Sequence, residues 1–222
     1  MKQLFTSLRR LVSYAVPLTR RVKTVHSGIA EITLSQGHKT LDTAHANYSY
    51  GSLQRVLRYG IRFTKPEAAK QVLVLGLGGG SIVQVLRQTP EFRGAITAIE
   101  FDPVIIQIAD EEFGVRPDDT LRIVCADAFA WVPAALDQQF DLIIIDLFLD
   151  LTMASGLGAA VFWEHIGRLL PPGGYVLFNT LTADSVLIDG EPAVDYWTQQ
   201  GFDVREVEVE LLNLLYILHK PG

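Results

Sequence analysis

Residues 72–81 read VLVLGLGGGS, and this stretch decides the fold. Four consecutive apolar residues at 72–75 predict a strand that is covered on both faces. The glycines that follow allow a sharp turn and a close approach of the backbone to a ligand, and the helix expected after Ser81 would point its free N–H groups at that ligand. The pattern favours a nucleoside-binding α/β domain, although Gly76-x-Gly78 followed by Ser81 is not a complete G-x-G-x-x-G fingerprint.

Outward from this stretch, apolar runs alternate with helical segments. The runs lie at 96–99, 121–124, 142–145 and 175–178, and the helical segments around 81–88, 103–112 and 159–169. Continuous Val/Ile/Leu runs are typical of a parallel sheet with helices on both faces. Two further runs, at 203–210 and 213–219, are separated by a short turn, which predicts an antiparallel last strand. We therefore predict a doubly wound, mostly parallel, seven-stranded Rossmann-like sheet.

The first 65 residues predict two additions to this domain. Apolar residues at helical spacing before Pro17 indicate a basic amphipathic helix. Two alternating runs around Gln36-Gly37 predict a β-hairpin, and a helix is expected from about residue 50 to 61. The chain should therefore have three parts: a basic amphipathic segment at 1–27, a small β-hairpin and helix at 28–65, and a nucleoside-binding domain at 66–222.

Composition argues against several classes of protein. The single cysteine, Cys125, cannot form an internal disulfide, and the five histidines lack metal-ligand spacing. The longest uncharged run, 169–183, is shorter than the roughly 20 apolar residues that span a bilayer. Residues 1–30 hold six basic and no acidic residues, whereas the remainder holds 13 basic and 25 acidic residues. This acidic body disfavours nucleic acid as a partner. We expect a cytoplasmic protein with no metal and no stable membrane insertion.

Three acids follow successive predicted strands. Glu100 lies 24 residues after Gly76, where an acid accepts hydrogen bonds from ribose hydroxyls. Asp127 follows the third strand and Asp146 the fourth. Because the carboxyl ends of parallel strands share one edge of the sheet, these acids should close on one crevice. The neighbouring Asp102 is instead expected to cap a helix that begins with a proline.

Five motifs in order, VLVLGLGGGS, AIEFDP, CADA, FDLIIIDLFLD and LLPPGGYVLFN, resemble the spermidine synthase family over roughly residues 28–220. These aminopropyltransferases are built on the class I methyltransferase fold. The resemblance implies a homodimer and a function for each matched position: Gly76, Gly78 and Gly80 form the nucleoside loop, Glu100 holds the ribose, Asp127 and Ala128 contact adenine, and Asp146 occupies the place of the catalytic acid. If the acceptor is an amine, Asp146 is expected to accept its proton and Tyr50 to orient it.

The chain also departs from that family. Gly79 stands where the family has the aspartate that grips the amine of decarboxylated S-adenosylmethionine, Gly51 replaces a polar residue after the tyrosine, and Leu149 stands where a second acid is expected. A buried ammonium without such partners is costly. The departures therefore favour S-adenosylmethionine and methyl transfer to a small acceptor, which could be an amine. Two alternatives remain open: aminopropyl transfer to putrescine or a related amine, and a catalytically silent scaffold that binds adenosyl ligands.

Overall fold

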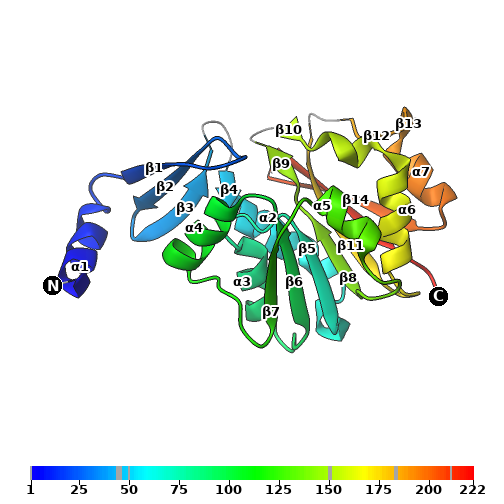
Figure 1. Cartoon of the computed structure of the whole chain (residues 1–222), viewed down its shortest axis with the longest axis horizontal. Coiled ribbons are helices and arrows are strands. Elements are labelled where there is room, and N and C mark those ends of the chain that lie inside the picture. Colours follow the sequence, from blue (N-terminus) through cyan, green and yellow to red (C-terminus); the bar gives the residue numbers. More distant parts are fainter. Residues whose placement is uncertain (1, 44–46, 50, 150–151, 183–184, 211) are drawn as a thin grey trace.

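The computed structural model describes residues 2–43, 47–49, 51–149, 152–182, 185–210 and 212–222. Within these residues, a seven-stranded sheet forms the centre of the molecule (Figure 1). Its strand order is β14 (Asp203–Val209), β15 (Asn213–His219), β11 (Tyr175–Leu181), β8 (Leu142–Ile145), β5 (Gln71–Leu75), β6 (Ala95–Glu100) and β7 (Leu121–Cys125). Strands β11, β8, β5, β6 and β7 are parallel, and β15 is antiparallel to both neighbours. The predicted Rossmann-like sheet is confirmed.

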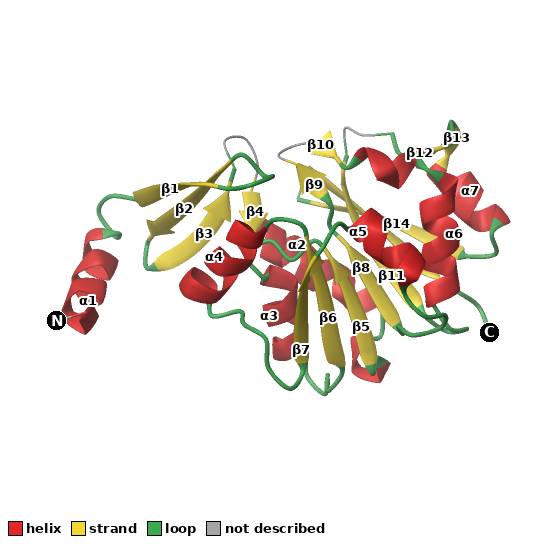
Figure 2. Cartoon of the chain, viewed as in Figure 1, coloured by secondary structure: helices red, strands yellow, loops and turns green. Residues whose placement is uncertain are grey.

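Helices cover both faces of this sheet (Figure 2). The helices are α2 (Ser52–Gly60), α3 (Ser81–Gln88), α4 (Pro103–Phe113), α5 (Ala128–Trp131), α6 (Ala160–Leu169) and α7 (Ala193–Gln199), with short 3-10 turns η1 (Ile61–Phe63), η2 (Pro66–Ala68), η3 (Val132–Ala134) and η4 (Ser155–Gly158). Leu73 and Leu75 of β5 pack in one core with residues of α6 and α7, whereas Val72 and Val74 pack in another with residues of α2 and α3. Because successive side chains of a strand face opposite sides, both faces need apolar residues, which explains the unbroken run at 72–75.

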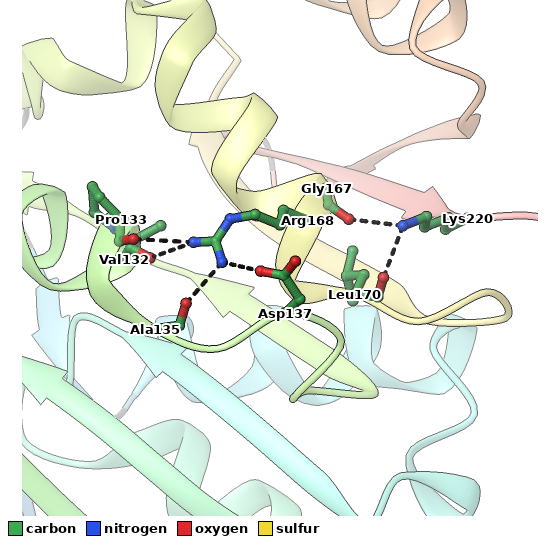
Figure 3. A network of polar contacts seen from close by, with 8 residues as sticks. All are labelled: Val132, Pro133, Ala135, Asp137, Gly167, Arg168, Leu170 and Lys220. Carbon is green, nitrogen blue, oxygen red and sulfur yellow. Dashed lines mark hydrogen bonds and ion pairs between the residues drawn. The ribbon is translucent and has the colours of Figure 1, made fainter.

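Arg168 and Lys220 fasten the end of α6 to its surroundings (Figure 3). Lys220 Nζ donates to the carbonyl oxygens of Gly167 and Leu170, each at 2.8 Å, and so caps the helix C-terminus. The Arg168 guanidinium donates to the carbonyls of Val132, Pro133 and Ala135 and pairs with Asp137. These contacts tie the chain end and η3 to α6, whose apolar side packs in the same core as Trp197.

A second, antiparallel sheet precedes the central one. It contains β1 (Leu18–Lys23), β2 (Ile29–Ser35), β3 (His38–Asp42) and β4 (Asn47–Ser49), in that order. The predicted hairpin is confirmed: Gln36 and Gly37 have φ values of 49° and 78°, as a tight hairpin turn requires. Strand β1 was not predicted, because the charged Arg20, on the same face of the strand as Leu18 and Val22, interrupts the alternation that they would otherwise show.

The N-terminal sheet packs on α4. Ala30, Ile32 and Leu41 form an apolar cluster with Ile105 and Ile108 of α4. Helix α1 (Lys2–Val12) precedes β1 and lies at the end of the molecule opposite the C-terminus (Figure 1). Helix α4 is therefore shared by both sheets, and it brings the N-terminal sheet next to the carboxyl end of β6.

Two short ribbons lie beside the central sheet. They are formed by β9 (Phe148–Leu149) with β10 (Thr152–Met153), and by β12 (Leu187–Ile188) with β13 (Glu191–Pro192). In the part of the chain that the structure describes, none of the helices combines the length and the apolar character that a membrane crossing needs. The same described residues contain no group of three or more His, Cys, Asp or Glu side chains that could hold a metal ion.

Candidate active site

A cavity of about 440 Å³ opens at the carboxyl ends of β5, β6, β7 and β8. Five of the eight residues predicted for the site line it: Gly76, Glu100, Asp127, Ala128 and Asp146. This edge of a doubly wound sheet is where such folds bind their ligands, and the volume lies within the range of small-molecule sites, roughly 300–1,000 Å³. The prediction that the three acids close on one crevice is confirmed.

The glycine loop is shaped by close contacts between backbones. Gly76 has a φ of 90°, and a Cβ at this position would lie 2.2 Å from the carbonyl oxygen of Asp146. Gly80 has a φ of 87°, and its Cβ would overlap the side chain of Val115. Gly78 and Gly80 are not among the described residues that line the cavity. These two glycines therefore shape the loop and the start of α3, and direct contact with a nucleoside remains a prediction for them.

Glu100 stabilises the glycine loop through hydrogen bonds to its backbone. Its carboxylate is buried, and Oε2 accepts hydrogen bonds from the amides of Leu77 at 3.1 Å and Gly78 at 3.0 Å. Oε1 accepts from the amide of Asp102 at 3.0 Å. Burial raises the pKa of Glu100, and these hydrogen bonds oppose the rise. The local sequence offers no structural reason for this acid, whereas the tertiary structure supplies one. Contact with ribose remains a prediction.

Asp127 and Ala128 begin α5 at the end of β7. Asp127 caps this short helix, since its Oδ1 accepts a hydrogen bond of 2.7 Å from the amide of Phe129. Asp127 is exposed and Ala128 is buried, so a polar group and an apolar surface lie side by side in the cavity wall. This pairing suits an adenine base, which presents an amino group and an apolar ring.

Asp146 follows β8 and is partly exposed in the cavity. Burial raises the pKa of its carboxyl group to about 6, although a hydrogen bond of 2.9 Å from Asn179 Nδ2 lowers it in part. Asn179 is itself buried, and its Oδ1 accepts from Asn213 Nδ2 at 3.0 Å. A line of two amides thus reaches from β15 through β11 to the acid.

Asn179 was not predicted as a site residue, although a signal was present. It is the first polar residue after the apolar run 175–178, on the strand that was expected to be parallel to that of Asp146. In the structure Phe178 pairs with Ile145 in register, so Asn179 lies beside Asp146. A polar residue that interrupts a buried strand at the ligand edge marks a site residue.

Asp102 caps α4 as predicted, and it also makes contacts that the sequence did not indicate. Its Oδ1 accepts from the amide of Val104 at 2.9 Å, while Oδ2 accepts from the amides of His26 at 2.5 Å and Ser27 at 3.0 Å. Burial raises the pKa of Asp102, but the hydrogen bonds outweigh this effect and lower it to about 2. The turn between β1 and β2 is thereby held at the cavity, where Ser27 forms part of the wall.

Of two remaining expectations, at Tyr50 and Gly51, the structure describes only the second residue. Tyr50, predicted to orient the acceptor, lies outside the described residues, and its function remains a prediction. Gly51 precedes α2 with a φ of 59°, a backbone conformation that residues other than glycine seldom adopt. The backbone conformation at this position thus explains why glycine replaces the polar residue of the family pattern.

Residues 73–178 match the family model described as "Methyltransferase domain". The chain is 28% identical over 197 residues to an eEF1A lysine and N-terminal methyltransferase homolog of Drosophila pseudoobscura pseudoobscura, a match that covers 82% of the chain and 28% of the relative. It is 33% identical over 143 residues to a polyamine aminopropyltransferase of Vibrio vulnificus (strain CMCP6), covering 63% of the chain and 46% of the relative. The chain thus matches less than half the length of either relative.

Among solved structures, human methyltransferase-like protein 13 in complex with SAH has a TM-score of 0.62 at 20% identity, over 78% of this chain and 83% of the other. This likeness shows a shared methyltransferase fold. The family match over residues 73–178, the named relatives and this shared fold support a transferase with the methyltransferase fold. The resemblance drawn from the five motifs is confirmed in part, since aminopropyltransferases and methyltransferases are both among the relatives.

Proposed function

We propose that the chain binds S-adenosylmethionine in the cavity and transfers its methyl group to the nitrogen of a small amine. One observation carries this proposal: Glu100, Asp127 and Asp146, from the ends of three strands, line one cavity with the first glycine of the loop. The relatives support an amine acceptor, since their names specify lysine, N-terminal and polyamine substrates.

The side chains of the cavity fit an adenosyl group. Asp127 offers a carboxylate oxygen for the adenine amino group. Glu100 is proposed to contact the ribose hydroxyls through Oε1, since Oε2 already accepts from the amides of Leu77 and Gly78. Ala128 and the 45% exposed ring of Phe101 supply apolar surface for the base. When bound, S-adenosylmethionine supplies a methyl carbon whose bond to the sulfonium sulfur breaks with the electron pair remaining on sulfur.

Gly79 favours the carboxylated donor over its decarboxylated form. An aspartate here would place a negative charge just before the N-terminus of α3, whose dipole favours anions. Gly79 adds no such charge, so the carboxylate of S-adenosylmethionine would meet no repulsion from this position. The loop therefore supports methyl transfer more than aminopropyl transfer.

Asp146 is the proposed proton acceptor. With a pKa of about 6 it is largely ionised near neutral pH, yet basic enough to take a proton from an amine whose nitrogen is forming a new bond. Asn179 holds Oδ1 of this carboxylate, so the acid has a defined orientation. Tyr50 is proposed to orient the acceptor.

Aminopropyl transfer to a diamine is the second candidate. The polyamine aminopropyltransferase of Vibrio vulnificus favours it, since this relative is 33% identical over 143 residues. Asp146 would act in the same way in either reaction, because both consume a neutral amine. The two reactions differ in the donor and in the thioether product.

The deciding experiment supplies each donor separately. The protein is incubated with S-adenosylmethionine or decarboxylated S-adenosylmethionine and a panel of amines, and the thioether products are measured by mass spectrometry. S-adenosylhomocysteine with an amine supports the proposal, whereas methylthioadenosine with a diamine supports the second candidate. Binding of S-adenosylhomocysteine without any product from either donor would indicate a silent scaffold. Light scattering on the same sample tests the proposed homodimer.

A further inference from the structure

Two buried acids, Glu100 and Asp102, each hold a backbone segment near the cavity. Glu100 accepts hydrogen bonds from the glycine loop at Leu77 and Gly78. Asp102 accepts from the turn between β1 and β2 at His26 and Ser27. The amide of Asp102 donates a hydrogen bond of 3.0 Å to Oε1 of Glu100, so the two acids are directly connected. The glycine loop and the N-terminal sheet are thus linked through Glu100 and Asp102, which lie at the end of β6 and just before α4.

Helix capping alone does not account for Asp102. The cap uses Oδ1, and a serine, threonine or asparagine would cap equally well. The side chain is completely buried, and a buried carboxylate is costly unless its oxygens are satisfied. The second oxygen obtains its two hydrogen bonds from the turn at His26 and Ser27. A carboxylate is required at this position because both oxygens must accept.

The turn that Asp102 holds forms a wall of the cavity. Ser27 lines the cavity together with Phe101. The ring of His26 stacks on that of Phe101 with a centroid distance of 3.9 Å and an interplanar angle of 28°. The turn is closed by Thr24, whose amide and hydroxyl both donate to the carbonyl oxygen of Gly28 at 2.9 Å. Moving this turn would therefore move the serine and release one face of the phenylalanine.

We infer that Asp102 is a positioning residue, which fixes the turn at His26 and Ser27 as the outer wall of the adenosyl site and thereby makes the N-terminal sheet part of cofactor binding. The inference rests on the proposed function, because it assumes that an adenosyl ligand occupies the cavity. The apolar ring of Phe101 suits the flat base.

The test is the variant Asp102→Asn. Asparagine keeps an oxygen for the α4 cap, but its NH₂ group cannot accept from the amides of His26 and Ser27. The dissociation constant of S-adenosylhomocysteine, measured by isothermal titration calorimetry, should rise about tenfold, as expected when buried donors lose their acceptor. The matched control is Glu112→Gln, which removes the exposed ion pairs of Arg20 and Lys39 between the same sheet and α4, outside the cavity lining. Its affinity should remain within about twofold of wild type.

A second variant keeps the inference falsifiable if Asp102→Asn fails to fold. Ser27→Phe retains the backbone N–H but projects a ring from the wall, and it should weaken binding strongly. In the Asp102→Asn background the same substitution should cost less, because the wall is already displaced. Unchanged affinity in folded Asp102→Asn or in Ser27→Phe, or fully additive losses, would overturn the inference. If wild type binds neither S-adenosylhomocysteine nor methylthioadenosine, the proposed function fails as well, and this outcome is distinct from the others.

Discussion

The side-chain amide of Asn179 donates a hydrogen bond of 2.9 Å to Oδ1 of Asp146, across two neighbouring parallel strands. The bond is directional, because the NH₂ group of Asn179 can only donate. It stabilises the ionised carboxylate against the burial that raises its pKa to about 6. The pKa of Asp146 is thus kept close to neutral pH, where a proton acceptor is most effective.

Replacing Asn179 with alanine should shift the pH profile of activity. Loss of the hydrogen bond leaves burial unopposed, so the pKa of Asp146 rises above 6 and the acid limb of kcat/KM moves to higher pH. Asn213→Ala is the matched control, because it removes the outer amide and leaves the contact between Asn179 and Asp146 in place. An acid limb at the same pH in both variants would show that Asn179 does not tune the acid.

Asp146→Asn should abolish turnover and leave nucleoside affinity largely intact. Asparagine retains the shape and accepts from Asn179 but takes up no proton, so kcat should fall by about 10²- to 10⁴-fold. The dissociation constant of S-adenosylhomocysteine should change little. Asp119→Asn, at an exposed position outside the cavity lining, serves as the control. Unchanged turnover would remove Asp146 from the mechanism.

Asp146→Asn should also be more stable than wild type above pH 6. The pKa of Asp146 is about 6 in the folded protein, against an ordinary value of 3.8, so the folded chain holds a proton that the unfolded chain releases between these pH values. Wild-type stability therefore falls as pH rises from about 4 to about 6. The gain of Asp146→Asn should be about 3 kcal/mol at about pH 7.5, as expected for a pKa that rises from 3.8 to about 6 on folding, and it should vanish near pH 4. Urea denaturation at several pH values measures it; a gain that does not vary with pH would contradict the prediction.

Gly76→Ala should lower both stability and nucleoside affinity. Gly114→Ala provides the comparison, since Gly114 also has a positive φ, 69°, but a Cβ added there would meet nothing within 4 Å. Both variants carry the backbone strain, of about 1 kcal/mol or more. Only Gly76→Ala adds an overlap with the backbone of Asp146. To relieve this overlap, the ends of β5 and β8 must move apart. Equal losses in urea denaturation for the two variants would argue against a tight contact between these strand ends.

Gly79→Asp should change the preference between donors. The added carboxylate would repel the carboxylate of S-adenosylmethionine, so KM for this donor should rise by about tenfold or more, whereas binding of the decarboxylated donor should not weaken. Gly79 is not among the glycines with positive φ, so its backbone conformation is one that other residues also adopt. Gly79→Asn has the same shape without the charge and should not discriminate between the donors. An equal effect of both substitutions would mean that size, and not charge, governs this position.

Much of the fold follows from local patterns in the sequence. The apolar runs, the helical spacing, the hairpin at Gln36-Gly37 and the cap at Asp102 each depend on neighbouring residues. That Glu100, Asp127 and Asp146 meet could also be predicted, because the carboxyl ends of parallel strands lie at one edge of the sheet.

The partners of these acids were decided by the tertiary structure. Asp102 and His26 are 76 positions apart in the chain, and Asp146 and Asn179 are 33 apart. No periodicity relates such residues. Their contacts depend on the packing of the N-terminal sheet on α4 and on the register between β8 and β11. The sequence by itself thus determined where acids would gather, because the helical segments expected between successive strands make those strands parallel and bring their carboxyl ends to one edge. Which amides hold each acid, and therefore its pKa and orientation, depended on how distant elements pack together.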